Sequence, residues 1–355
     1  MPILTRPVLK ISLENLAHNY KVLRRVSVGR AAAVVKTDAY GLGAIEVVRR
    51  LVSEGCDAFF VAHAIEGAEI RSVAPQADIY VLQGVGQDSA ELFWTHHLTP
   101  VISSPNMLAL WNGLNIEGIK PIIQVETGLN RLGFRANDIA ELRQSSIGCF
   151  SYVLSHLACA DEQNHFMNAH QLSSFEKVRK MLNLPATLSA SDGVFLGNEY
   201  HYDMVRLGAA MYGLNTVKGL TISAIKPVAF VSAPILQIEH VSVGECVGYG
   251  ATFTAKHPMK LAVISIGYGD GLMRSLSNRG HVRINGVNAP IIGRISMDNI
   301  MCDITDVGEV QMGDMASLLD DVYQADDMAR DAGTIGYEIL SALGKGKRFF
   351  KCYEG

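Results

Sequence analysis

Apolar strand segments alternate with helical segments through the first two thirds of the chain, and this alternation limits the folds that the chain can adopt. Apolar runs predict strands at residues 8–13, 31–35, 58–62, 79–82, 100–102, 120–125, 150–155, 186–189 and 204–207. Helical spacing predicts helices between them, at residues 13–23, 45–52, 64–71, 105–114 and 175–182. About eight such units fit an α/β (β/α)8 TIM-type barrel better than a doubly wound sheet, so we expect residues 1–222 to form a barrel.

The remainder of the chain, residues 223–355, has a different pattern. Strand-like segments occur at residues 228–231, 235–241, 261–266 and 281–285, and the turns among them are rich in glycine, asparagine and proline. We therefore expect a separate, mainly β domain over residues 223–355.

Composition limits the partners and the compartment. The 355 residues exceed what one hydrophobic core usually serves, which favours two domains. A formal net charge of -4 argues against nucleic-acid binding, and no basic cluster indicates a membrane surface. No uncharged apolar stretch is long enough to span a bilayer, and the six cysteines lie far apart without a C-x-x-C pair. We expect a cytoplasmic protein without a metal site, whose partner is a small molecule or another protein chain.

The strand predicted at residues 31–35 ends abruptly at Lys36, and Gly41 and Gly43 indicate a turn after it. The C-terminal ends of barrel strands carry the chemistry in this class of fold. A lysine partly removed from water there has a lowered pKa that suits Schiff-base formation. From this segment alone, a solvated lysine at the end of a strand is the alternative.

Residues 36–43 resemble the pyridoxal-phosphate signature of the alanine racemase family. Further segments resemble motifs of that family and follow in its order, at residues 124–133, 155–161, 248–253, 266–271, 293–298 and 337–340. The resemblance covers nearly the whole chain. It implies an isomerase that interconverts L-alanine and D-alanine on pyridoxal 5'-phosphate by a two-base mechanism. A racemase of broader specificity, acting on serine, lysine or similar amino acids, is the alternative.

The resemblance assigns the two bases to Lys36 and Tyr249. In the family the lysine holds the cofactor as an internal aldimine and acts as the base on one face of the α-carbon. The matching tyrosine is the base on the other face, which requires that its pKa be lowered from about 10. Without the resemblance, Tyr249 would be interpreted as an exposed aromatic residue in a turn.

The resemblance also implies a set of cofactor-binding residues. The phosphate would be held by Tyr40, by the Ser191 hydroxyl and by the backbone N–H groups of Gly208 and Ala209. Arg206 would donate to the pyridine nitrogen, and His156 would lie against the cofactor ring and couple Arg206 to Tyr249. From the residues alone, Tyr40 could be a packed aromatic, Arg206 a member of a buried ion pair and His156 a structural histidine.

Substrate-binding residues are implied in the same way. Arg131 would contact the phenolic oxygen of the cofactor and help to hold the substrate carboxylate, and the backbone N–H of Met297 would bind that carboxylate. Tyr268 would line an inner gate, with Asp298 close by. Many family members carry a carbamylated lysine where this chain has Gln124, so Arg131 would be held less firmly or by another acceptor. Asp161, Arg274 and Arg294 would line the access corridor.

The two bases lie in different predicted domains. In the family, the domain that carries the tyrosine completes the barrel site of a second chain, so the resemblance implies a homodimer with shared active sites. Two other classes remain as rivals. One is a decarboxylase on a similar architecture, against which the Tyr249 segment speaks. The other is a non-catalytic pyridoxal-phosphate carrier, which would need neither Tyr249 nor the β domain.

Overall fold

The computed structural model describes residues 5–142, 148–219 and 224–355 and divides the chain into two compact units. One unit comprises Leu16–Ala39 and Gly43–Lys226, and the other comprises Met1–Asn15, Tyr40–Leu42 and Pro227–Gly355. The boundary predicted between residues 222 and 223 lies outside the described residues. The N-terminal segment that the prediction assigns to the barrel belongs to the C-terminal unit.

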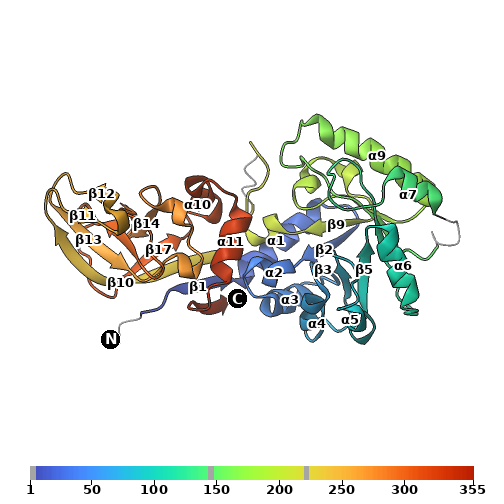
Figure 1. Ribbon diagram of the computed structural model, residues 1–355, viewed down its shortest axis with the longest axis horizontal. Helices are drawn as coiled ribbons and strands as arrows, with labels where there is room; N and C mark the ends of the chain where they lie inside the picture. The colour runs from blue at the N-terminus through green and yellow to red at the C-terminus, as the bar shows by residue number, and fades with distance from the viewer. Residues whose placement is uncertain (1–4, 143–147, 220–223) are drawn as a thin grey trace. The chain divides into compact units, whose positions relative to one another are not determined.

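The first unit contains an eight-stranded parallel sheet that is nearly closed into a barrel (Figure 1). Its strands are β2 (Arg30–Val34), β3 (Ala58–Val61), β4 (Asp78–Val81), β5 (Leu98–Ile102), β6 (Ile122–Gln124), β7 (Tyr152–Leu154), β8 (Ala186–Thr187) and β9 (Met204–Leu207). Strand β2 pairs with both β3 and β9, and a bridge between Ala190 and Arg206 joins the segment after β8 to β9. The predicted barrel architecture is therefore confirmed.

The helices of this unit lie outside the strands (Figure 1). They are α1 (Leu13–Val26), α3 (Ala44–Ser53), α4 (Ala64–Arg71), α5 (Ala90–Thr95), α6 (Pro105–Gly113), α7 (Ala136–Glu141) and α9 (Phe166–Leu182). In α3 the buried residues are Ala44, Val47, Val48 and Leu51, which recur at the spacing of one helical face. None of the helices in the described part of the chain combines the length and the hydropathy that a membrane span requires.

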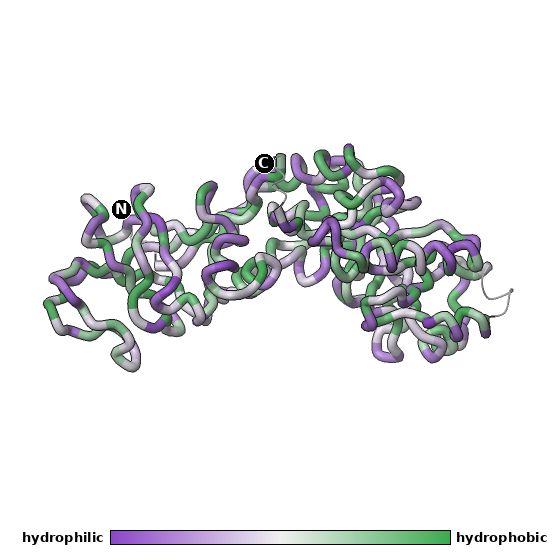
Figure 2. Tube along the Cα trace, turned by 90° about the horizontal axis from the view of Figure 1, so that it is seen from above, coloured by the Kyte–Doolittle hydropathy of each residue, from purple (hydrophilic) through white to green (hydrophobic). Residues whose placement is uncertain are grey.

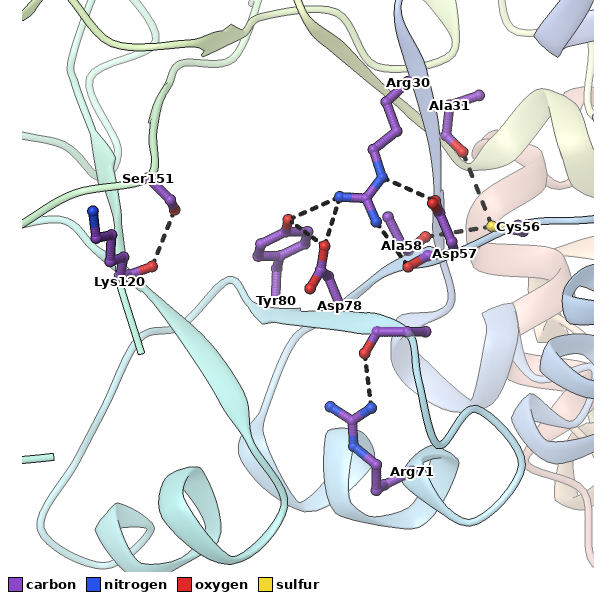
Figure 3. A network of polar contacts seen from close by, with 11 residues as sticks. Arg30, Ala31, Cys56, Asp57, Ala58, Arg71, Asp78, Tyr80, Lys120 and Ser151 are labelled. Carbon is purple, nitrogen blue, oxygen red and sulfur yellow. Dashed lines mark hydrogen bonds and ion pairs between the residues drawn. The ribbon is translucent and has the colours of Figure 1, made fainter. Parts of the chain in front are cut away.

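Hydrophobic and hydrophilic stretches alternate along the chain, as Figure 2 shows. The barrel strands are nearly apolar on both faces, since every residue of β3 is buried. At the N-terminal ends of the strands, Arg30 binds Asp57 and Asp78, with Nε–Oδ1 and Nη1–Oδ2 distances of 2.9 and 2.6 Å (Figure 3). This ionic cluster links the starts of β2, β3 and β4.

The second unit is mainly β. Its strands are β1 (Val8–Ser12), β10 (Ala229–Val241), β11 (Cys246–Val247), β12 (Phe253–Thr254), β13 (Met259–Ile264), β14 (His281–Ile284), β15 (Val287–Pro290), β16 (Ile300–Asp303), β17 (Met315–Leu319) and β18 (Phe350–Glu354). Two helices accompany them, α10 (Ala325–Ala332) and α11 (Gly336–Gly344). The predicted class of this part of the chain is confirmed.

Two details of this unit differ from the sequence-based expectation. Strand β1 pairs with β10 and β18 and is not a barrel strand. Its residues alternate between buried and half-buried, as in a sheet with one covered face, whereas barrel strands such as β3 and β9 are buried at every position. The segments predicted as two strands form the single strand β10, which continues through Pro234 with a register shift close to it.

Candidate active site

Lys36 lies two residues after the last residue of β2, at the C-terminal end of the barrel strands. Its side chain is half-buried. Burial lowers the pKa of Lys36, the cations Arg131 and Arg206 lower it further, and Glu66 acts in the opposite direction. The amine is therefore easier to deprotonate than a solvated lysine, which suits a nucleophile or a base.

The backbone after Lys36 forms a left-handed turn that the sequence analysis missed. Thr37, Asp38, Ala39 and Tyr40 have φ values of 57°, 53°, 52° and 59°. Left-handed helical geometry costs about 1–2 kcal/mol for each residue other than glycine. The turn is held by the Ala39 N–H, which donates to the Val35 carbonyl at 2.9 Å, and by the Ala44 N–H, which donates to Asp38 Oδ1 at 2.7 Å. Strain of this kind is typical of functional sites.

Arg206 is buried at the end of β9 and is held through its two terminal nitrogens. Nη1 donates to Thr187 Oγ1 at 2.7 Å, and Nη2 donates to the carbonyls of Ser155 and Leu188 at 2.8 and 3.1 Å. Burial lowers the pKa of Arg206 to about 9, so the guanidinium remains a cation at neutral pH. Among the described residues, no hydrogen bond uses Nε of Arg206, so this donor remains for a ligand.

His156 lies beside Arg206, with a distance of 3.3 Å between His156 Nδ1 and Arg206 Nη2. Burial lowers the pKa of His156 to about 3, and the cations Arg206, Arg131 and Lys36 contribute to this shift. The imidazole is therefore neutral at physiological pH. Because a guanidinium can only donate, Nδ1 must be the acceptor, and the ring proton resides on Nε2. The structure thus shows His156 in contact with Arg206, and the coupling of Arg206 to Tyr249 through His156 stays a prediction.

A buried polar chain supports the segment that carries His156. Gln171 of α9 donates through Nε2 to the His156 carbonyl at 3.0 Å and to Thr127 Oγ1 at 3.2 Å, and its Oε1 accepts from the Ala158 N–H at 2.8 Å. Thr127 and Ser155 share a hydrogen bond of 2.8 Å between their hydroxyl oxygens. Gln171 was not predicted as part of the site, because the helix was predicted to begin at Phe175, whereas α9 begins at Phe166.

Three of the four residues predicted to bind a phosphate, Ser191, Gly208 and Ala209, also come together. Ser191 is buried at the start of the 3-10 helix η1 (Asp192–Phe195), and its Oγ accepts from the Gly208 N–H at 2.8 Å. Ala209 begins the next 3-10 helix, η3 (Ala209–Tyr212). The first N–H groups of a helix have no acceptor within it. The Ser191 hydroxyl proton and the Ala209 N–H are therefore donors that an anion could use.

Arg131 lies in an exposed loop that is held by hydrogen bonds among its own residues. The Glu126 carboxylate accepts from the N–H groups of Gly128 and Arg131, and Gln124 Nε2 donates to the Leu132 carbonyl at 3.0 Å. For the Arg131 guanidinium, the described residues provide no hydrogen bond or ion pair. The Gln124 side chain therefore supports the loop by a hydrogen bond to the backbone of Leu132, while the Arg131 side chain stays available to a ligand.

The other predicted residues belong to the C-terminal unit. Tyr40 is buried and packs on Tyr337, with 6.0 Å between the ring centroids. Tyr249 is 70% exposed in the 3-10 helix η4 (Tyr249–Ala251), between two glycines of positive φ. A Cβ on Gly250 would lie 2.6 Å from Arg294 Nη1, so the glycine lets this guanidinium approach the turn. Tyr249 also borders an open groove of about 580 Å³.

Tyr268, Met297 and Asp298 lie in two loops that are bonded to each other. The Tyr268 N–H donates to the Ser296 carbonyl at 3.0 Å, and the Gly269 N–H donates to the Met297 carbonyl at 2.9 Å. Arg348 holds both loops. It binds Asp270 through Nε–Oδ1 and Nη2–Oδ2 contacts of 2.7 and 2.8 Å and also pairs with Asp298.

Arg348 was missed by the sequence analysis, as were Glu66 and Thr187. Asp270 is only 1% exposed, so its carboxylate depends on this arginine. Asp161, predicted to line a corridor, pairs with Lys218 at 3.0 Å. A single signal could have indicated Thr187, because it is a polar residue between the apolar Ala186 and Leu188 of a predicted strand.

Comparison with known proteins identifies the family. Residues 11–216 match the family described as alanine racemase, N-terminal domain, and residues 228–351 match alanine racemase, C-terminal domain. The chain is 39% identical to a catabolic alanine racemase of Mesorhizobium japonicum, with 98% of this chain and 93% of that protein covered. It is 40% identical to a biosynthetic alanine racemase of Agrobacterium fabrum, with 95% and 91% covered.

Solved structures give the same result. The fold superposes on the crystal structure of an alanine racemase from Bartonella henselae with covalently bound pyridoxal phosphate, with a TM-score of 0.94, 34% identity and coverage of 98% and 99% of the two chains. A biosynthetic alanine racemase from Pseudomonas aeruginosa gives a TM-score of 0.91 at 32% identity, with 99% of each chain covered. Family, fold and the cluster around Lys36 agree, and the chain belongs to the alanine racemase family.

Proposed function

We propose that this chain is a pyridoxal-phosphate-dependent alanine racemase, an isomerase that interconverts L-alanine and D-alanine. The observation that carries the proposal is the contact between buried Arg206 and neutral His156, which lie at the same end of the barrel as Lys36. Membership of the alanine racemase family supports it.

The residues present fit pyridoxal phosphate. Lys36 offers an amine with a lowered pKa for covalent attachment. Arg206 retains the unused Nε donor for a ring nitrogen, and Ser191 and Ala209 retain donors for a phosphate. When bound, the cofactor supplies the electron sink that makes the α-proton of an amino acid acidic.

Lys36 and Tyr249 are proposed as the two bases. Lys36 Nζ would take the α-proton on one face, and Tyr249 Oη would give a proton on the other, with the roles reversed for the opposite enantiomer. Arg206 would stay charged and keep the ring nitrogen that it contacts unprotonated. This weakens the electron sink and disfavours transamination.

The substrate carboxylate is assigned to cations and backbone donors. Arg131 would bind it with a guanidinium that the described residues leave unpaired. The Met297 N–H would contribute a second donor, while Tyr268 and Asp298 would limit the space for the side chain. Tyr40 would reach the cofactor phosphate.

We propose further that the enzyme works as a homodimer with shared active sites, in the cytoplasm, where it supplies D-alanine. The exposure of Tyr249 beside an open groove supports the dimer, because a second chain could cover this surface and receive the tyrosine. Sedimentation should give a dimer at catalytic concentration. A fully active monomer would refute this part of the proposal.

The test is exchange with deuterated water. The purified protein, loaded with pyridoxal phosphate, is incubated with L-alanine, and chirality and α-deuterium are followed over time. We expect racemisation with deuterium uptake, and a loss of more than about 100-fold in Lys36→Ala and in Tyr249→Phe. Tyr152→Phe serves as the matched control.

Two outcomes would favour other functions. If alanine stays inert while serine or lysine racemises, the broader-specificity racemase replaces this proposal. A single added methylene changes discrimination by only about 1–3 kcal/mol, so kcat/KM should be compared across the series. Release of an amine and carbon dioxide would indicate a decarboxylase, and cofactor absorbance without any turnover would indicate a carrier.

A further inference from the structure

The Glu66 side chain links the segments that follow two neighbouring barrel strands, β2 and β3, next to Lys36.

 Its carboxylate lies in the first turn of α4, which follows β3. Oε1 accepts from the Thr37 N–H at 2.6 Å, while Oε2 accepts from the N–H groups of Ala62 and His63 at 2.6 and 3.0 Å. The contacts with Ala62 and His63 cap the helix, but the contact with Thr37 reaches the segment that follows β2.

The Thr37 contact extends the pairing of the two strands. The last backbone bond between them runs from the Val35 N–H to the Phe60 carbonyl, at 2.8 Å. Thr37 is also the first residue of the left-handed turn. A charged acceptor at 2.6 Å therefore holds the strained backbone at its first residue, one position beyond Lys36.

Glu66 also differs in charge from the other groups that act on the lysine amine. Arg131 and Arg206 are cations, and His156 beside Arg206 is neutral at physiological pH. Glu66 contributes a negative charge and favours the protonated amine. The carboxylate thus raises the pKa of the Lys36 amine, whereas the two arginines lower it.

We propose that Glu66 is a positioning residue for Lys36, which fixes the backbone beyond the lysine and balances the positive charge around its amine. This inference rests on the proposed function, because it concerns the attachment of pyridoxal phosphate to Lys36. It extends that function by giving a role to a residue that lies outside the predicted site.

The experiment measures attachment of the cofactor rather than turnover. Full-length protein is freed of pyridoxal phosphate and mixed with it across a range of pH, and the rate of attachment is followed by absorbance. Attachment requires the deprotonated amine, so the midpoint of the pH–rate curve reports the pKa of Lys36, and the plateau reports its positioning.

Three variants separate charge from geometry. In Glu66→Gln, loss of the negative charge should move the midpoint down by about 0.5 to 1 pH unit, and loss of one acceptor oxygen should lower the plateau. In Glu66→Asp, the charge is kept and the reach is shortened, so we expect a smaller shift with a lower plateau. Glu69→Gln, an exposed position on the same helix, should match the wild type.

Failure of this inference can be told from failure of the proposed function. If wild-type protein attaches the cofactor and Lys36→Ala does not, the proposed attachment stands. A wild-type midpoint and plateau in Glu66→Gln, with only a lower melting temperature, would then reduce Glu66 to a helix cap and overturn the inference. Should Glu66→Gln fail to fold, an unchanged plateau in Glu66→Asp would overturn it equally.

Discussion

His156 illustrates how a single half-buried residue can tie stability to pH. Its pKa is lowered to about 3 in the folded chain, from an ordinary value of 6.5. Between these values the unfolded chain binds a proton that the folded chain does not, so stability rises with pH. This contribution is complete above pH 6.5 and is lost as the pH falls towards the folded pKa.

We predict that His156→Gln flattens this dependence. Urea unfolding of the wild type between pH 6.5 and about 4 should include a slope from this residue of up to about 1.4 kcal/mol per pH unit, which the variant lacks. The exposed His257→Gln serves as the control and should keep the wild-type slope. Parallel curves for the wild type and His156→Gln would contradict the assignment of a neutral imidazole to His156.

The ion pair between Asp270 and Arg348 leads to a second prediction about single residues. Arg348→Met would leave a buried carboxylate without its cation, which typically costs about 3–5 kcal/mol. Since Arg348 is partly exposed, we expect a loss near the lower end, measured by urea unfolding. The double variant Asp270→Asn with Arg348→Met should recover part of the loss, and no recovery would mean that the two residues act independently.

At the scale of elements, Gly41 determines how the chain continues after the left-handed turn that follows Lys36. It has a φ of 86°, and an added Cβ would lie 2.7 Å from Gly344 Cα and 2.8 Å from the Leu340 carbonyl oxygen. Both neighbours are backbone atoms of α11 and cannot move aside cheaply. Glycine is therefore required here for its conformation and for space.

We predict that Gly41→Ala costs about 2 kcal/mol or more in stability. Gly286→Ala is the matched control, because its φ is 80° and nothing lies within 4 Å of an added Cβ. That control should cost only about 1 kcal/mol of backbone strain. Equal losses in the two variants, measured by thermal and urea unfolding, would show that the contact with α11 is unimportant.

Local patterns predicted most barrel strands, since continuous apolar runs mark strands that are buried on both faces. They also predicted Lys36 and Arg206, because a charge at the end of an apolar strand is conspicuous. Contacts over long distances in the sequence were beyond such patterns: β1 pairs with β18, Arg348 with Asp270, and Glu66 with Thr37. The left-handed turn was missed because three of its four residues, Thr37, Ala39 and Tyr40, do not favour that geometry.

At the scale of the molecule, the two ends of the barrel strands have different tasks. Lys36, His156 and Arg206 lie at the C-terminal ends, whereas the ionic cluster of Arg30, Asp57 and Asp78 lies at the N-terminal ends (Figure 3). In barrels of this kind, chemistry is found at the first end and stabilising contacts at the second.

We predict that Arg30→Met lowers stability by about 1–2 kcal/mol and leaves kcat/KM unchanged. The loss follows from the network, in which one guanidinium serves two carboxylates and the Asp57 carbonyl. Arg49→Met, which removes an exposed pair with Glu46, should have almost no effect. A fall in kcat/KM of the folded Arg30→Met protein would contradict this division.

The pairing of β1 with β18 has a consequence for synthesis of the chain. Every strand of the barrel has been translated by Leu207, so this unit can fold while the ribosome is still working. Strand β1 is made before every barrel strand, yet its parallel neighbour β18 is made after all of them. One edge of β1 must therefore stay unpaired while the whole barrel is made, and a chaperone that shields exposed strand edges would be of most use to the nascent chain there.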